Sequence, residues 1–346
     1  MNLQSVLEKQ TIHASVPCRV DFGGTLDIST FYLPMIRKGP SSVNLALDMR
    51  THVTLFPFQN GGVKVSSKGF ESAVFKQYLA PFNHPMGLMF AVADYFDVHG
   101  VHIHIESTSP PRSALGGSSA AAVAIAAAIL TAQGRSIVPE QVAWLIHYIE
   151  ASVAGVPCGV QDQLAAAFGG VNQWHWKMGN TAPEFDRHIL CSTDDERQEL
   201  NDCMLVAYCG IPHVSKDINS QWVASFVRGE TRHSFETICE LTTAFASAIK
   251  EKQFETAAEL MNQETLLRCK MTPEVLDNIG KKLFETAVTL GCGARFTGAG
   301  GGGCLWAVGQ LSDITALRPA WQEILSHVKD GALLDVTIDN AGIIIH

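Results

Sequence analysis

The segment PRSALGGSSA, residues 111–120, places glycines and hydroxyls directly before an alanine-rich helix pattern. Small residues let a ligand approach the backbone, and the first turn of a helix presents unpaired amides and the positive end of its dipole. These features favour an anion site, most naturally for phosphate. An ordinary serine N-cap explains the same residues equally well, so the segment alone leaves both interpretations open.

The hydroxyls of Ser118 and Ser119 extend the phosphate interpretation, because either could reach phosphate oxygens or a bound Mg²⁺. The segment is not a Walker A loop, since G-x-x-x-x-G-K-[ST] occurs nowhere in the chain.

A second glycine-rich segment is GARFTGAGGGGC, residues 293–304, in which Gly298–Gly303 formally matches G-x-G-x-x-G. We reject a dinucleotide-binding fingerprint, because the segment runs into the strand pattern CLWAV and no helix follows to receive a pyrophosphate. A hairpin turn is the alternative. Each glycine costs roughly 0.5–1 kcal/mol relative to alanine, which indicates that the backbone here passes very close to something.

A third segment, PCRVDFGGTLD at residues 17–27, joins a strand pattern to a double glycine and then Asp27. Arg19 and Asp27 could form a surface pair, so this segment carries no function by itself.

Composition excludes several classes of protein. The 346 residues are 47% hydrophobic and 17% charged, which is typical of a globular chain. A net charge of −9 argues against nucleic-acid binding but not against a small anionic ligand. The nine cysteines form no C-x-x-C pair and no cluster with histidine, so we expect reduced thiols. Neither a signal peptide nor a membrane span is indicated, and we expect a cytoplasmic protein with no membrane partner.

The elements that must position these segments follow from periodicity. In the first half we expect strands at 12–23, 48–58, 63–67 and 101–107, and helices at 86–96, 117–132, 139–154 and 161–168. In the second half we expect helices at about 215–228, 232–250, 253–268 and 274–290, and strands at 204–211, 295–298, 304–308 and 336–346. The chain is thus predicted to be an α+β protein with domains at 1–190 and 191–346. His102 and His104 share one face of their strand, where solvated or hydrogen-bonded imidazoles are favoured over a metal pair.

Together the three segments resemble, in order and spacing, the three motifs of the GHMP kinase superfamily, and the resemblance covers the whole chain. A fourth segment, GVQDQLAAAFGGVN, resembles the catalytic-aspartate segment of its sugar-kinase branch, and YCGIPHVSKDI resembles a further passage of that group. The similarity is greatest to heptose 7-phosphate kinase, galactokinase and fucokinase-like members. It implies an N-terminal half like ribosomal protein S5 domain 2 and a ferredoxin-like C-terminal half.

The first motif departs from the sugar-kinase pattern. Asp27 follows Arg19 by eight residues, one fewer than in galactokinase or heptose kinase. Gly24 and Thr25 stand where galactokinases have a Glu-His pair that contacts sugar, which argues against galactose as the substrate.

The resemblance implies an ATP- and Mg²⁺-dependent kinase acting on a sugar or sugar phosphate, with the anomeric hydroxyl as the expected acceptor. Asp162 is the implied base and Arg19 its neighbouring cation, while Ser119 and Glu150 are the implied metal ligands. The implied nucleotide-binding residues are Pro111, Ser113, Ala114, Leu115, Gly116, Gly117, Ser118, Ser119 and Ala120. The implied substrate-binding residues are Asp27, Gly24, Thr25, Gly300, Gly301, Gly302 and His213.

Several alternatives remain beside this interpretation. Asp162 could be a favourable helix N-terminal acid, and Glu150 a solvent-facing helix glutamate. The protein could also be a non-catalytic sugar or nucleotide sensor, or a kinase for a mevalonate- or homoserine-like substrate. The latter would need a cationic pocket for a carboxylate or phosphate.

Overall fold

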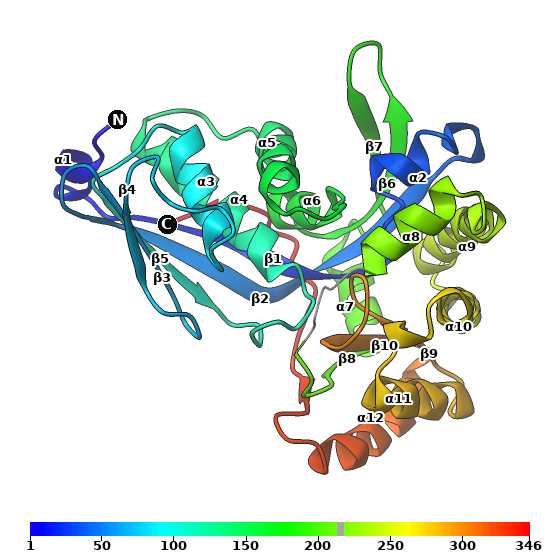
Figure 1. Ribbon diagram of the computed structural model, residues 1–346. Helices are drawn as coiled ribbons and strands as arrows, with labels where there is room; N and C mark the ends of the chain where they lie inside the picture. The colour runs from blue at the N-terminus through cyan, green and yellow to red at the C-terminus, as the bar shows by residue number, and fades with distance from the viewer. Residues whose placement is uncertain (213–217) are drawn as a thin grey trace.

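The computed structural model describes residues 1–212 and 218–346, which form two sheets with their helices (Figure 1). Within the described residues, eight strands form the first sheet and four form the second. The predicted α+β class with a two-domain architecture is confirmed.

The first sheet has the order β12-β1-β2-β5-β3-β4, and β6 pairs with both β2 and β7. Its strands are β1 Ile12–Phe22, β2 Ser41–Pro57, β3 Gly62–Ser67, β4 Ala73–Lys76, β5 Val101–Ser107, β6 Val171–Met178, β7 Pro183–Ile189 and β12 Ile344–Ile345. The long β1 and β2 pair along their length, with a shift in register between Pro17 and Cys18. One end of β2 therefore pairs with β6 and the other with β5.

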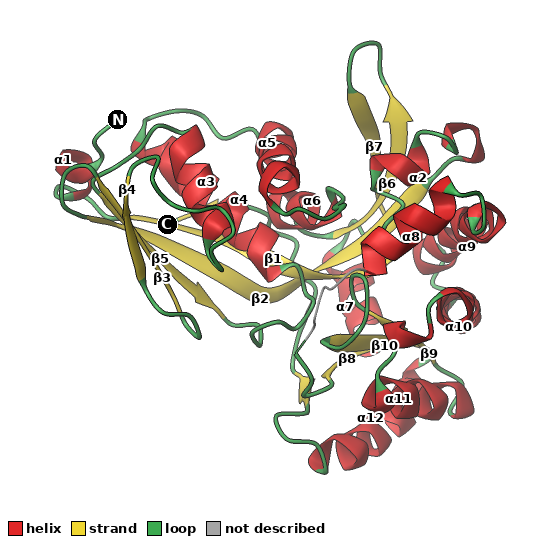
Figure 2. Ribbon diagram, in the orientation of Figure 1, coloured by secondary structure: helices red, strands yellow, loops and turns green. Residues whose placement is uncertain are grey.

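The helices of this half gather mainly on one face of the sheet (Figure 2). They are α1 Gln4–Leu7, α2 Ser29–Tyr32, η1 Ile36–Lys38, α3 Gly87–Tyr95, α4 Gly117–Ala132, α5 Pro139–Val153 and α6 Gln161–Phe168. Helix α4 is the central one, because every residue from Ser119 to Leu130 is buried. Its alanines let the sheet and α3, α5 and α6 pack closely around it, as expected for a helix that is apolar on all sides.

The second sheet has the order β11-β8-β10-β9 and is antiparallel throughout. Its strands are β8 Met204–Tyr208, β9 Gly293–Phe296, β10 Cys304–Val308 and β11 Ala332–Leu334. The helices are α7 Asp194–Asp202, α8 Ile218–Val227, α9 Arg232–Lys250, α10 Phe254–Met271, η2 Pro273–Val275, α11 Asn278–Thr289 and α12 Leu311–Ser326. Numbered along the chain, the strand order is 4-1-3-2, as in a ferredoxin-like unit with extra helices in its first crossover.

The end of the chain differs from the expected strand at 336–346. Only Ile344–Ile345 forms a strand, and it pairs with β1 of the first sheet. The preceding residues bond irregularly along β2, with Asp339 accepting from Gly170 N and donating to Ala46 O. The last residues thus return to the first sheet, although the predicted division had assigned them to the second half; the boundary at 190 stays a prediction.

Candidate active site

The three glycine-rich segments meet at the C-terminal end of β1. Arg19 on β1 donates its backbone N–H to Leu115 O and its Nη1 to Ala114 O, at 3.1 and 2.7 Å. From the third segment, Cys304 N donates to Ser113 O at 2.9 Å. The phosphate-loop candidate is therefore fixed between the other two segments, as a composite site requires.

The backbone at the start of α4 allows other groups to approach it closely. Its N-cap is Gly116, with φ +75°, and no side chain caps the helix. The alternative of a serine N-cap is therefore wrong, and the first amides of α4 bond to no side-chain acceptor among the described residues. A Cβ on Gly116 would lie 3.2 Å from the carboxylate of Asp162, so this glycine lets the helix terminus approach that acid.

Asp162 lies in the first turn of α6 and pairs with Arg19. Arg19 Nε and Nη2 contact Asp162 Oδ1 at 2.8 and 2.7 Å. The Asp162 side chain is 24% exposed, whereas that of Arg19 is 5% exposed. Burial lowers the pKa of Arg19, but the nearby carboxylates of Asp162 and Asp21 outweigh it and raise the pKa overall. The pair is thus a fixed charge with one accessible carboxylate.

Glu150, on α5, faces the same helix terminus. Its Oε2 accepts from Ser119 Oγ at 2.8 Å and from Gln163 Nε2 at 2.6 Å. Burial, together with the charge of Asp162, raises the pKa of Glu150 to about 7, and the hydrogen bonds from Ser119 and Gln163 only partly oppose it. The contacts do not fit a solvent-facing glutamate. A hydroxyl and a carboxylate that has no cationic partner in the described part of the chain form a hard-oxygen set of the kind Mg²⁺ prefers.

The two adjacent serines have different environments. Ser119 is 5% exposed and bonds to Glu150, while Ser118 is exposed. This contrast favours Ser119 as the side chain able to share a ligand with Glu150.

Asp27 is buried and holds the start of α6. Its Oδ2 accepts from Gln161 N at 2.9 Å, which satisfies a free amide of that helix. A Cβ on Gly159 would lie 1.7 Å from the same oxygen, so a glycine is required there. Burial, with the charges of Asp162 and Asp21, raises the pKa of Asp27 to about 6 against the opposing hydrogen bond from Gln161.

Gly24 and Thr25 are held by a buried arginine. Arg268 on α10 donates Nη2 to Gly24 O at 2.7 Å and Nη1 to Thr25 Oγ1 at 3.1 Å. Thr25 itself has φ +76°. The contacts of Gly24 and Thr25 with Arg268 fix the loop before Asp27. These two residues would therefore influence a substrate by positioning that loop.

The third segment contributes different glycines from those expected. Gly298 N donates to Asp21 Oδ1 at 2.7 Å, and a Cβ there would lie 3.5 Å from Arg19 Nη2. A Cβ on Gly303 would lie 2.7 Å from Ser113 O. By contrast, Gly301 N donates to Val275 O and a Cβ on Gly300 would meet the same residue. Gly302 has φ +105°, and His213 lies outside the described residues.

Sequence reasoning missed a second ionic cluster behind the site. Glu264 on α10 accepts from Arg268 and Arg295, each through Nε at 2.9 Å. Arg295 also binds Asp21 Oδ2 at 2.9 Å, and Asp21 lies 3.5 Å from Arg19 Nη1. We call Asp21, Glu264, Arg268 and Arg295 the sealed cluster, because all four side chains are 0% exposed. The i,i+4 spacing of Glu264 and Arg268 was the available signal.

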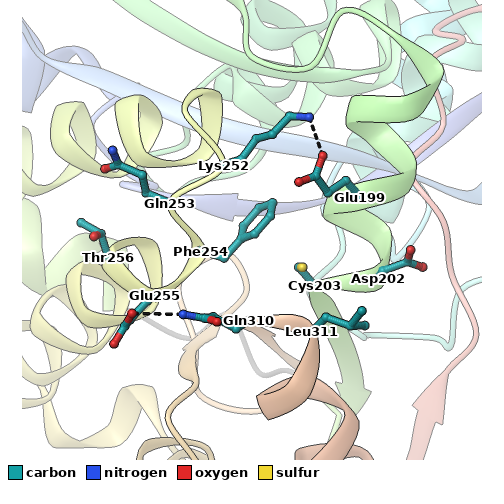
Figure 3. Close-up of a pocket in the computed structure, with 10 residues that line it drawn as sticks. All are labelled: Glu199, Asp202, Cys203, Lys252, Gln253, Phe254, Glu255, Thr256, Gln310 and Leu311. Carbon is teal, nitrogen blue, oxygen red and sulfur yellow. Dashed lines mark hydrogen bonds and ion pairs between the residues drawn. The ribbon is translucent and has the colours of Figure 1, made fainter.

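A shallow pocket of about 560 Å³ lies elsewhere, on the second half of the molecule (Figure 3). Lys252 pairs with Glu199 across it, and Gln310 donates to Glu255. Its remaining lining residues are Asp202, Cys203, Gln253, Phe254, Thr256 and Leu311. None of the site residues described above lines it.

This two-domain fold is shared with solved structures of small-molecule kinases. A heptose 1-phosphate kinase from Bacteriodes thetaiotaomicron superposes with a TM-score of 0.74 at 16% identity, covering 97% of this chain and 98% of that one. Galactokinase from Lactococcus lactis gives 0.73 at 17% identity, covering 99% of each. A mevalonate kinase from Thermococcus onnurineus is 26% identical over 78% of this chain and 83% of its own length.

The family models agree with the fold. The GHMP kinases N terminal domain matches residues 83–170, and the GHMP kinases C terminal domain matches residues 245–327. The chain belongs to the GHMP kinase family and is a kinase. No helix among the described residues is long and apolar enough to cross a membrane.

Proposed function

We propose that this GHMP kinase transfers the γ-phosphoryl group of ATP to a hydroxyl of a sugar or sugar phosphate, with the anomeric hydroxyl as the acceptor. One observation carries the proposal: the uncapped start of α4 lies against Asp162, which pairs with Arg19. A phosphate bound at this helix terminus would lie next to the proposed base, as in-line transfer requires.

The nucleotide phosphates would bind at residues 111–120. The free amides at the start of α4 and its dipole favour the negative charge of the β- and γ-phosphates. Ser113 and Leu115 are held by backbone bonds to Cys304 and Arg19. A loop fixed beforehand loses little entropy on binding and directs its amides at the developing charge.

Asp162 would orient the acceptor hydroxyl and accept its proton. Arg19 pairs with Asp162, and its charge would lie beside the position where negative charge shifts during transfer. Phosphoryl transfer depends mainly on positioning and charge stabilisation, which these two residues supply without further chemistry.

Ser119 and Glu150 would hold Mg²⁺, which supplies charge neutralisation at the phosphates when bound. Gln163 donates to Glu150 and fixes its orientation. The cofactors of the proposal are therefore ATP as phosphoryl donor and Mg²⁺.

A hydroxyl-rich acceptor is supported by the polar groups around Asp27. Gln161 is buried beside it, and its Oε1 has no hydrogen-bond partner among the described residues. The guanidinium groups of the described site are already paired: Arg19 with Asp162, and Arg268 and Arg295 with Glu264. Around Asp27 and Asp162, the described residues thus offer hydrogen-bond acceptors for sugar hydroxyls more evidently than they offer a cation for a substrate carboxylate.

Mevalonate is the second candidate substrate, because a relative 26% identical over most of the chain is a mevalonate kinase. It would place a carboxylate near these residues and would need a cation that the paired arginines do not offer.

The test is ADP formation from Mg-ATP with a panel of free sugars, sugar phosphates, mevalonate and homoserine. Sugar-dependent turnover supports the proposal. Turnover with mevalonate alone would replace the sugar assignment, and binding of sugar and nucleotide without turnover would indicate a sensor.

A further inference from the structure

Three histidines gather far from the active site, at the other end of the first sheet. His13 lies near the start of β1, His52 on β2 and His346 directly after β12. Among the described residues, these form the one group of three metal-binding side chains whose ligand atoms all lie within 4.8 Å of one another. His13 and His52 are half-buried and His346 is exposed.

The strand register explains the gathering. His13 pairs with Thr54 across β1 and β2, and Ser15 pairs with His52. His346 donates its backbone N–H to His13 O at 2.9 Å. It therefore lies opposite His13 along the edge of β1 that pairs with β12, whereas β2 pairs with the other edge. Because alternate residues share a face of a sheet, all three imidazoles project from one face, opposite the core residues Ala14 and Val53.

Hydroxyls orient two of the rings. His13 Nδ1 lies 2.8 Å from Thr54 Oγ1, which leaves Nε2 directed at His52 Nδ1, 3.3 Å away. Two nitrogens on one tetrahedral Zn²⁺, each at about 2.0–2.1 Å, are separated by about 3.3 Å. His346 Nε2 lies 3.0 Å from Ser15 Oγ. Such outer hydrogen bonds are a usual feature of histidine ligands.

We propose that His13, His52 and His346 bind one divalent transition-metal ion of the zinc class, and that the ion fastens the C-terminal segment to β1 and β2. Three imidazoles leave a fourth tetrahedral position for water. Nitrogen ligands select zinc, copper or nickel over the magnesium that serves the kinase reaction.

The position of the site argues for fastening rather than catalysis. His13 precedes Arg19 by six residues of one strand, or about 20 Å. Arg50 already holds the same segment, through Asp339 and the carbonyls of Ala341 and Gly342. A metal at His346 would extend this attachment from the middle of the segment to its last residue (Figure 1).

The other histidines of the sheet provide a contrast. His102 and His104 on β5 both bond to Ser66 Oγ, at 2.7 and 2.9 Å. His175 and His188 on β6 and β7 lie as a tilted pair with ring centroids 4.6 Å apart. His175 is therefore a matched control: a half-buried strand histidine next to another imidazole, with no third one grouped with them among the described residues.

The experiment titrates the full chain, freed of metal by a chelator, with Zn²⁺ followed by calorimetry and with Co²⁺ followed by its visible spectrum. We expect one equivalent to bind, with the intense visible bands of tetrahedral Co²⁺. His52→Gln and His346→Gln should each weaken Zn²⁺ binding by more than about tenfold, and His175→Gln should leave it unchanged. His346 is exposed at the end of the described chain, so its substitution keeps the fold.

A second measurement tests the fastening. Hydrogen exchange of residues 343–346 should slow when Zn²⁺ is added to the wild-type chain but not to His346→Gln. The proposal is overturned if the wild-type chain does not bind one equivalent of Zn²⁺ or if all variants bind Zn²⁺ alike. It is also overturned if Zn²⁺ does not change the hydrogen exchange of residues 343–346.

Discussion

Two glutamates with little access to solvent, Glu150 and Glu264, show opposite electrostatics. Glu264 lies between Arg268 and Arg295, and although burial raises its pKa, the two positive charges outweigh burial and lower it. Among the described residues Glu150 has only Ser119 and Gln163 as hydrogen-bond partners, and burial raises its pKa to about 7. Within this part of the chain, one carboxylate is paired with two cations, whereas the other is paired with none.

The difference distinguishes a region that stabilises the fold from the region proposed to bind ligands. The sealed cluster joins β1 to α10 and β9, and every charge in it has a partner. The region of Glu150, Asp162 and the start of α4 is incomplete by the same standard, since its helix has no side-chain cap and its glutamate pairs with no cation among residues 1–212 and 218–346. Buried charge without a partner is unfavourable, so this region is where external cations and phosphates would complete the electrostatics.

The largest expected effect follows from removing the proposed base. Asp162→Asn should lower kcat by about 10²–10⁴-fold, the usual range for general acid–base catalysis, while nucleotide affinity changes little. Steady-state kinetics and nucleotide titration measure the two quantities.

Glu140→Gln is the matched control for this variant, because Glu140 is an exposed acid in the first turn of α5. If Asp162 served only the helix dipole, both variants would retain normal turnover and lose a little stability. Normal turnover by Asp162→Asn would refute the assignment of the base.

Breaking the sealed cluster should act on stability instead. Glu264→Gln removes the carboxylate that pairs with Arg268 and leaves Arg295 with Asp21 alone, and loss of one partner of a buried pair costs about 3–5 kcal/mol. Urea unfolding should show this loss, whereas Glu259→Gln, an exposed change on the same helix, should stay within about 0.5 kcal/mol of wild type. If the two variants were equally stable, the sealed cluster would not have the stabilising role assigned to it.

Much of the fold followed from local pattern. The predicted helix at 117–132 and strand at 304–308 agree with α4 and β10 in their bounds, because apolar composition and glycine borders define both. Helix α12 was missed; it contains Pro319 in its interior, and proline normally interrupts a helix. The hairpin of β6 and β7 was also missed, and β7 alternates exposed and half-buried residues without a strong apolar face.

The site residues could be predicted where they lie in recognisable motifs. They could not be predicted where contacts between residues far apart in the sequence determine the geometry. Arg19 and Asp162 are 143 residues apart, and only the resemblance joined them before the structure did. No pattern indicated that Thr25 bonds to Arg268, 243 residues away, or that Gly298 rather than Gly301 faces Arg19. Such contacts depend on how the two sheets pack, which local periodicity does not encode.

The choice between the two serines sharpens the metal assignment. Ser119→Ala removes the hydroxyl next to Glu150, and we expect the Mg²⁺ concentration for half-maximal activity to rise about tenfold, equivalent to one lost hydrogen bond or ligand of about 1.4 kcal/mol. Ser118→Ala should leave the Mg²⁺ dependence unchanged, since that side chain is exposed. The reverse outcome would exchange the roles of the two serines.

The carboxyls of the incomplete region should also give the stability a pH dependence of their own. The pKa of Glu150 is raised to about 7 and that of Asp27 to about 6, so between their ordinary values and these each carboxyl binds more protons in the native state than in the unfolded chain. The contribution of each carboxyl to stability without Mg²⁺ should therefore fall as pH rises through this window, by at most about 1.4 kcal/mol per pH unit. Histidines such as His13 and His52, whose pKa burial lowers, act in the opposite direction, so the quantity to measure is the difference between wild type and Glu150→Gln. Glu150→Gln should flatten the upper part of this slope, and Mg²⁺ binding to wild type below pH 7 should release a proton that the variant does not release. If urea unfolding showed the same pH dependence for wild type and Glu150→Gln, or if Mg²⁺ bound without proton release, the contrast with Glu264 would fail.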